Sequence, residues 1–246
     1  MGLLMRYLII GDVHAAFGSA DKVIQRAIKE HAPVDQIIQV GDMGFAFPNC
    51  RPWQTDHGCH QVWIDGNHDN HEMLALRDKP NFGTDPYHSS GWAKFLELWE
   101  YKPRGSFENG ILYIGGAASI DRQWRTEGVD WWPGENISYE QEEQIMDTIQ
   151  RVGSEAIHTV ISHDAPTGFS MLPALQAVQG PNAREFGDNN RKFLEYVRQQ
   201  VMPDHWFFGH YHSRGEGETD GCKWRCIDMV RGGNIENEDY AILEIP

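Results

Sequence analysis

The chain has 246 residues, of which 40% are hydrophobic, 11% aromatic and 23% charged, so it is long enough to bury a substantial core. Its 21 lysines and arginines against 36 aspartates and glutamates give a formal net charge of -15, which argues against non-specific binding of duplex nucleic acid. The negative charge does not exclude phosphorylated small molecules as substrates, because bound cations can make the binding site locally positive.

The sequence shows no sign of export or of membrane insertion. Its N-terminal apolar run is short, has no basic segment before it and ends in polar residues, so we expect no signal peptide. No apolar run approaches the ~18 residues that a membrane-spanning helix needs. Four cysteines in a chain of this length do not indicate a disulfide framework. We therefore expect a cytoplasmic protein without a membrane partner, and the sequence does not indicate its oligomeric state.

The first part of the chain alternates between strand and helix patterns. Residues Met5–Ile10 read as a strand, and Ser19 is the expected cap of a helix with apolar residues at helical spacing. A second strand is predicted at Gln36–Val40 and a third at Gln61–Ile64. A strand, a helix and a strand in so few residues predict a right-handed βαβ unit with parallel strands.

The second part of the chain has the same α/β character. A helix is predicted at Trp92–Tyr101 and a strand at Ile111–Ile114, and Ser138 with Gln141 forms a capping box for a further helix. The other expected elements are a helix capped by Asp188 and strands at Ile157–Ile161, His205–Phe208, Lys223–Met229 and Tyr240–Ile245. No repeat or low-complexity linker divides the chain, so we predict one domain spanning residues 1–246.

Five of the strand-like runs end in Asp, Asn or His. Asp12 and His14 stand two residues apart after the first strand, so in extended backbone their side chains point to the same side. The fragments at the five strand ends are Gly11-Asp12-Val13-His14, Gly41-Asp42, Gly66-Asn67-His68-Asp69, Ser162-His163-Asp164 and Gly209-His210-Tyr211-His212. Such strand ends build a metal site at one edge of a sheet.

In this order the five fragments resemble those of the calcineurin-like metallophosphoesterases, and the match covers most of the chain. The resemblance implies an α/β fold of two mixed β-sheets packed face to face with flanking helices, and a dinuclear metal centre at the carboxyl ends of the strands. It implies that Asp12, His14 and His212 bind the first ion, that Asn67, His163 and His210 bind the second, and that Asp42 bridges both.

Carboxylate and imidazole ligands suit two divalent ions drawn from Mn, Fe, Zn and Co, whose identity the sequence does not fix. The implied reaction is in-line attack on phosphorus by a hydroxide held between the metals. His68 is implied to be a non-ligand facing the phosphate, and we assign it to protonating the leaving oxygen or hydrogen-bonding the phosphoryl group. The alternative is a histidine that only supports its loop. We expect Asp69 to orient that loop or to cap the next helix.

One motif departs from the phosphoprotein-phosphatase branch of this family. That branch continues its second motif as Gly-Asp-x-x-Asp-Arg-Gly, in which the second Asp partners the catalytic His and the Arg grips phosphate. In this chain Phe45 and Ala46 occupy those two positions. The departure puts Ser/Thr protein phosphatase activity in doubt and leaves the protonation state of His68 open.

Two long loops leave strand ends and are candidate substrate-binding segments. We expect the tryptophans of residues 117–136 to pack over the core. The loop's arginines either bind phosphate or pair with nearby carboxylates. Residues 164–187 are a candidate lid with Gly and Pro hinges. The residues concerned in the first loop are Arg122, Trp124, Arg125, Trp131 and Trp132, with Asp121, Glu127 and Asp130 as the carboxylates.

The leading hypothesis is a metal-dependent phosphoesterase acting on phosphomonoesters or phosphodiesters of small molecules or nucleotides. The alternative at the same site is a nuclease or a cyclic-nucleotide phosphodiesterase. A hypothesis from another class is a non-catalytic binding scaffold on the same fold. Loss of metal ligands would favour the scaffold, whereas here every ligand position is filled.

Overall fold

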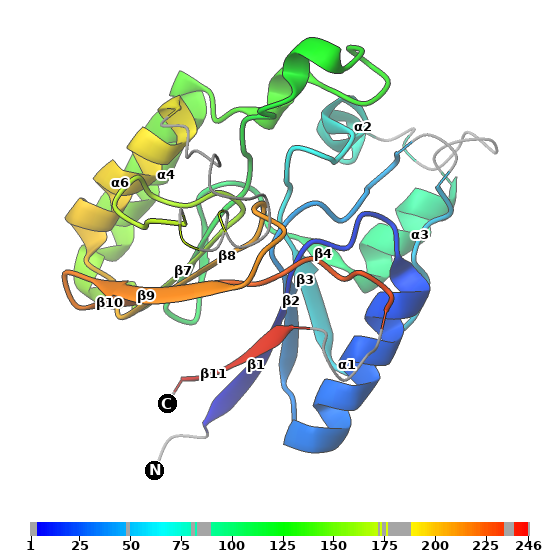
Figure 1. Cartoon of the computed structure of the whole chain (residues 1–246), viewed down its shortest axis with the longest axis horizontal. Coiled ribbons are helices and arrows are strands. Elements are labelled where there is room, and N and C mark those ends of the chain that lie inside the picture. The colour runs from blue at the N-terminus through cyan, green and yellow to red at the C-terminus, as the bar shows by residue number, and fades with distance from the viewer. Residues whose placement is uncertain are drawn as a thin grey trace.

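Two β-sheets packed face to face form the centre of the molecule, with helices on both outer sides (Figure 1). The structure is a computed structural model that describes residues 4–47, 50–79, 82, 90–171, 173, 176, 188–233 and 239–245. The first sheet has the order β11-β1-β2-β3-β4, and the second has the order β5-β6-β7-β8-β10-β9. Both sheets mix parallel and antiparallel pairs, as expected.

The first sheet contains β1 (Met5–Ile10), β2 (Gln36–Gln39), β3 (His60–Trp63), β4 (Glu100–Tyr101) and β11 (Tyr240–Ile245). The second contains β5 (Ser106–Glu108), β6 (Ile111–Ile114), β7 (Thr159–Ser162), β8 (His205–Phe208), β9 (Gly215–Thr219) and β10 (Cys222–Cys226). The α-helices are α1 (Phe17–His31), α2 (His71–Leu76), α3 (Ser90–Leu98), α4 (Tyr139–Val152) and α6 (Asn189–Val201), and the 3-10 helices are η1 (Arg122–Trp124), η2 (Pro133–Glu135) and η3 (Ser154–Ala156).

Buried apolar side chains form three layers, one between the two sheets and one on the outer face of each sheet. Between the sheets, Ile9 and Ile38 of the first sheet belong to the same buried cluster as Ile161 of the second. Helices α1 and α3 cover the outer face of the first sheet, and α4 and α6 cover the outer face of the second (Figure 1). Because each sheet is covered on both faces, apolar residues fill the middle of its parallel strands, such as Ile37 and Ile38 of β2 and Val160 and Ile161 of β7.

The predicted βαβ unit is confirmed, since β1 and β2 are parallel and α1 connects them. The residues of α1 at helical spacing that face the sheet are buried, namely Ala20, Val23, Ile24 and Ala27. The expected cap at Ser19 is wrong. The helix begins at Phe17, and its N-cap residue Ala16 provides no side-chain cap, so Ser19 lies inside the first turn.

The later capping predictions are confirmed, and some element boundaries are corrected. Ser138 and Gln141 form the capping box of α4, and the Asp188 side chain caps α6. The helix expected to reach Tyr101 ends at Leu98, because the next residues pair with β3 as β4. The hairpin strand β9 was not expected, since its sequence Gly-Glu-Gly-Glu-Thr has no apolar alternation.

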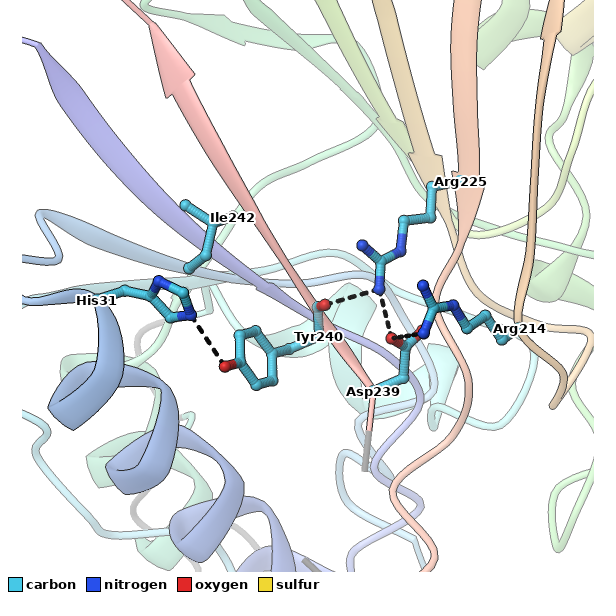
Figure 2. A pocket seen from close by; sticks show the side chains of 6 residues that line it. All are labelled: His31, Arg214, Arg225, Asp239, Tyr240 and Ile242. Atoms are coloured by element: carbon cyan, nitrogen blue, oxygen red, sulfur yellow. Dashed lines mark hydrogen bonds and ion pairs between the residues drawn. The ribbon is translucent and has the colours of Figure 1, made fainter. Parts of the chain in front are cut away.

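Arg225 joins the two sheets near the start of β11. Its guanidinium donates hydrogen bonds to the Asp239 carboxylate and, at 2.9 Å, to the carbonyl oxygen of Tyr240 (Figure 2). The Tyr240 hydroxyl lies 3.0 Å from the His31 ring nitrogen at the end of α1. These contacts line a surface pocket of about 340 Å³ that contains none of the predicted metal ligands, and we assign it a structural role.

Within the described residues, no helix combines the length and apolar character needed to cross a membrane. Most of the candidate lid at residues 164–187 lies outside the described residues, which include only 164–171, 173 and 176 of it.

Arg104, in the loop between β4 and β5, connects the loop after β3 to the segment that carries η2. Its buried guanidinium donates to the Asp65 carboxylate at 2.6 and 3.0 Å and to the carbonyl oxygens of Gly134 and Glu135. Burial alone would raise the pKa of Asp65, but Arg104 and His71 together hold that pKa below its ordinary value. The ion pair is therefore intact at neutral pH.

Replacing Arg104 by methionine should lower the free energy of unfolding by about 3–5 kcal/mol, because the buried Asp65 carboxylate would lose its partner. Urea unfolding at pH 7 measures the loss. Arg214→Met is the control: this side chain is 59% exposed, and its loss should cost less than about 1 kcal/mol. Equal effects of the two substitutions would contradict a stabilising role for Arg104.

Candidate metal centre

The predicted site residues lie just beyond the carboxyl ends of parallel strands from both sheets. Loops after β1, β2 and β3 belong to the first sheet, and loops after β7 and β8 belong to the second. The carboxyl ends of parallel strands are where ligands bind in open α/β sheets. The residues that these loops bring together are Asp12, His14, Asp42, Asn67, His68, His163, His210 and His212.

Four of these residues form a group that could hold a metal ion. One ligand atom from each of Asp12, His14, Asp42 and His212 lies within 4.8 Å of the others. The Nε2 atom of His212 is 3.2 Å from Asp12 Oδ2, and Nε2 of His14 is 3.6 Å from Asp42 Oδ2. Both carboxylates are buried, and both imidazoles are partly buried. The group is therefore a cluster of hard and borderline candidate ligands whose atoms already lie close together.

A second group adjoins the first and shares Asp42 with it. Nε2 of His163 lies 3.3 Å from Asp42 Oδ1 and 3.3 Å from Asn67 Oδ1. The other ring nitrogen of His163 is 2.8 Å from the carbonyl oxygen of Val40, which leaves Nε2 facing the two oxygens. The rings of His163 and His210 have centroids 5.1 Å apart. The shared carboxylate is thus the link between the two groups.

The residues of this site fit divalent ions. Asp42 Oδ1 accepts a 2.6 Å hydrogen bond from the His68 amide, while Asp42 Oδ2 is buried and accepts none from the described residues. A buried carboxylate oxygen without a donor is costly unless a cation satisfies it. Oxygen and imidazole ligands without thiolate suit first-row divalent metals. This site therefore indicates divalent metal ions, whose identity it does not specify.

Tight turns bring the loops to the site. Four of the site residues have left-handed backbone, with φ of 45° at His14, 55° at Asp42, 68° at His210 and 49° at His212. Such strained conformations cluster at functional sites, because the surrounding structure must hold them. The Asp42 carbonyl oxygen accepts the amides of Val13 and His14 at 3.0 and 2.8 Å, which fixes the first two loops together.

Close approach also requires glycine at one position. A Cβ atom on Gly66 would overlap Asp42 Oδ1, so any larger residue would displace the shared carboxylate. Gly66 is the residue directly before Asn67, which explains why the third fragment begins with glycine.

Burial and charges within the site shift the pKa values of its candidate ligands. Burial opposes ionisation of Asp42, but the nearby His163, His68 and His14 hold its pKa well below the ordinary value. Burial, followed by repulsion from His163, lowers the pKa of His210 to about 4. Its ring is then neutral at pH 7 and has a nitrogen lone pair free for a metal.

Asn67 is held by a pair of residues that sequence reasoning missed. Its amide nitrogen donates to Ser119 Oγ at 3.0 Å, and Ser119 Oγ donates to Glu135 at 2.6 Å. The Asn67 carbonyl oxygen is therefore the atom that faces His163. Ser119 and Glu135 belong to the loop after β6 and to η2, and no local pattern in the sequence marks either residue.

His68 lies beside the site and faces it with its ring. Its centroid is 4.8 Å from that of His14. Burial lowers the pKa of His68 to about 4, with Asp42 opposing the shift and Arg125 adding to it. The imidazole is therefore neutral at pH 7 and carries one N–H donor.

The arginines of the loop spanning residues 117–136 have different contacts. Arg125 forms a two-bond pair with Asp121, at 2.6 and 2.8 Å, and also touches His68. Arg122 stacks over the Trp131 ring, with its guanidinium carbon 4.0 Å from the ring centroid. Trp131 and Trp132 are buried as expected, whereas Trp124 is 78% exposed, so the expectation fails for Trp124.

Asp69 has the loop-orienting role expected of it. Its buried carboxyl group accepts hydrogen bonds from the amides of Gly44, Phe45 and Gly66 at 2.8–2.9 Å, and Asn70 rather than Asp69 caps α2.

The Phe45 ring packs against Trp63, Trp92 and Phe95 in the core. Phe45 therefore contributes to the packing of the core and does not provide a carboxylate as a partner for His68.

Comparisons with known proteins agree with this site. The model of the calcineurin-like phosphoesterase family matches residues 5–214, a range that includes every predicted ligand. A probable cyclic nucleotide phosphodiesterase of Synechococcus sp. is 22% identical, over 87% of this chain and 79% of that protein.

Two solved structures show the same fold. TT1561 of Thermus thermophilus has a TM-score of 0.54 at 10% identity, with 99% of this chain and 100% of that chain covered. The phosphopantetheinyl hydrolase of Mycobacterium tuberculosis has a TM-score of 0.51 at 14% identity, with 100% and 97% covered. The family match shows that the chain belongs to the calcineurin-like phosphoesterase family, and together with the metal-binding geometry it identifies the chain as a metal-dependent phosphoesterase.

Proposed function

We propose that this enzyme hydrolyses small phosphomonoesters or phosphodiesters at a site for two divalent ions. The observation that carries the proposal is the shared Asp42 carboxylate, buried between two groups of ligands and holding one oxygen without a hydrogen-bond donor from the described residues. In the proposed assignment the first ion is held by Asp12, His14 and His212, the second by Asn67, His163 and His210, and Asp42 bridges them.

The two ions, when bound, would supply Lewis acidity toward the phosphoryl group and lower the pKa of coordinated water toward neutrality. The chain's own residues would orient the substrate and hydrogen-bond to it. His68, neutral and next to the ligand groups, would donate a hydrogen bond from its N–H to the phosphoryl group or to the leaving oxygen. Ser119 would keep the Asn67 carbonyl oxygen turned toward the second ion.

We further propose that residues 1–246 act as one domain, because the proposed ligands come from strands of both sheets. Cyclic nucleotides are a second candidate substrate class within the diesters. The observation that favours them is the relative from Synechococcus, which is named for that activity and matches 87% of this chain.

Turnover of 4-nitrophenyl phosphate against bis(4-nitrophenyl) phosphate tests the proposal. The protein would be stripped of metal and reconstituted separately with Mn, Fe, Zn or Co, and 3′,5′-cyclic AMP would be assayed beside the aryl esters. We expect metal-dependent turnover of at least one ester, and the ratio of the two rates chooses between monoester and diester chemistry. Two ions bound per chain with no turnover of any of these substrates would contradict the proposal.

A further inference from the structure

We propose that Arg125, held in place by Asp121, is the phosphate-binding arginine of this enzyme and also positions His68. The inference rests on the proposed function and adds to it a substrate-binding residue outside the family-like fragments. Phe45 and Ala46, which follow the shared Asp42 closely in sequence, offer no charged side chain to a phosphate, so a guanidinium at this site has to come from another loop.

The position of Arg125 places its charge at the rim of the site. One terminal nitrogen of its guanidinium lies 2.9 Å from Nε2 of His68, and the other lies 3.2 Å from Nδ1. The His68 ring is in turn in edge contact with the ring of His14, at 4.8 Å between centroids. A phosphoryl group that His68 can reach therefore lies within reach of the same guanidinium.

The guanidinium is held rigidly before any substrate binds. Asp121 accepts two of its N–H groups, and the Asp130 carbonyl oxygen accepts a third at 3.1 Å. The Arg125 side chain is only 13% exposed, compared with 43% for Asp121. An arginine fixed in this way loses little conformational entropy when it binds an anion.

Counting hydrogen bonds shows that the guanidinium has a donor to spare. A guanidinium has five N–H groups, and the three bonds to Asp121 and Asp130 leave two, both directed at His68. An imidazole in either protonation state has at most one nitrogen lone pair with which to accept. At least one N–H of Arg125 is therefore free for an incoming oxygen atom, and phosphate oxygens are preferred partners of arginine.

Asp121 has the positioning role in this arrangement. Its two hydrogen bonds orient the plane of the Arg125 guanidinium. Asp121 and Arg125 are four residues apart and lie at the two ends of η1. Its side-chain bonds among the described residues go to Arg125 rather than to the proposed ligands, so its effect on substrate would pass through Arg125.

Inhibition by inorganic phosphate provides the test, with Mn-loaded protein and an aryl phosphoester as the reporter. Arg125→Gln should weaken phosphate inhibition by about 10- to 100-fold, the loss expected for one hydrogen bond to a charged group, and raise KM by a similar factor. Asp121→Asn should raise the inhibition constant for phosphate and the KM by a smaller factor, and the variant should keep two metal ions per chain. Arg125→Lys keeps a charge without the planar fork and should recover only part of the loss.

Arg122→Gln is the matched control, because Arg122 lies in the same loop and stacks on Trp131 rather than on His68. It should leave phosphate inhibition within about threefold of the wild type. If Arg125→Gln also stays within that range, or if its effect comes with loss of bound metal, the inference is overturned. If the wild type itself shows no turnover, calorimetric binding of inorganic phosphate to the Mn-loaded variants still tests Arg125 separately from the proposed function.

Discussion

Replacing Asp42 by asparagine is expected to abolish turnover and to leave fewer than two metal ions per chain. The substitution keeps the shape of the side chain but removes the negative charge shared by the two ligand groups. Bound metal supplies several kcal/mol of transition-state stabilisation, so its loss should slow hydrolysis at least about 10³-fold. Metal content by atomic emission, measured with the aryl ester assay, checks both parts of the prediction.

Asp78→Asn is a suitable control for that experiment. Its carboxylate is 80% exposed and pairs only with the neighbouring Arg77 among the described contacts, so the variant should keep full activity. Full activity and normal metal content in Asp42→Asn would remove Asp42 from the bridging position and would require another residue to join the two groups.

Replacing His68 by asparagine should slow turnover by about 10²–10⁴-fold while two ions stay bound. The ring is neutral at neutral pH because its pKa is about 4, and it contacts His14 and Arg125 without being among the proposed ligands. Asparagine keeps a hydrogen-bond donor, but its shorter side chain does not reach the position of the ring Nε2. Single-turnover rates with excess metal would separate this loss from a loss of metal.

His158→Asn provides the comparison, since that side chain is 57% exposed and lies before β7 at the opposite end of the strand from His163. It should retain wild-type rates. A loss of one ion in His68→Asn would make His68 a ligand, and an unchanged rate would leave it only the supporting role in its loop.

The fold and the identity of the candidate site residues were predictable, because both depend on local patterns. Each run such as Leu8–Ile10 is apolar since a strand covered on both faces needs no polar residue, and the first polar residue after it falls at the sheet edge. Periodicity likewise gave the buried face of α1. The start of that helix was not predictable in this way, because no side chain caps it.

The supports of the site were not predictable, because they depend on pairs far apart in the sequence. Asn67 and Ser119 are 52 residues apart, and His68 and Arg125 are 57 residues apart. Nothing near Ser119 marks it as the partner of an asparagine on another sheet. From the sequence, the arginines of this loop could either bind phosphate or pair with nearby carboxylates. Only the fold shows that Arg125 lies beside His68 and that Arg122 lies over Trp131.

The antiparallel pairing of β11 with β1 has a consequence for how the chain must assemble. Met5 aligns with Ile245 and Ile10 with Tyr240, so the strand that leads to Asp12 receives its outer neighbour from a segment more than 200 residues later. Until that segment is in place, β1 presents an unpaired apolar edge, a template on which other chains can add. Contacts of such long sequence separation also slow folding. The last strand therefore protects the completed molecule from aggregation, whereas a chain still being synthesised lacks that cover, although β11 contributes no residue to the proposed metal site.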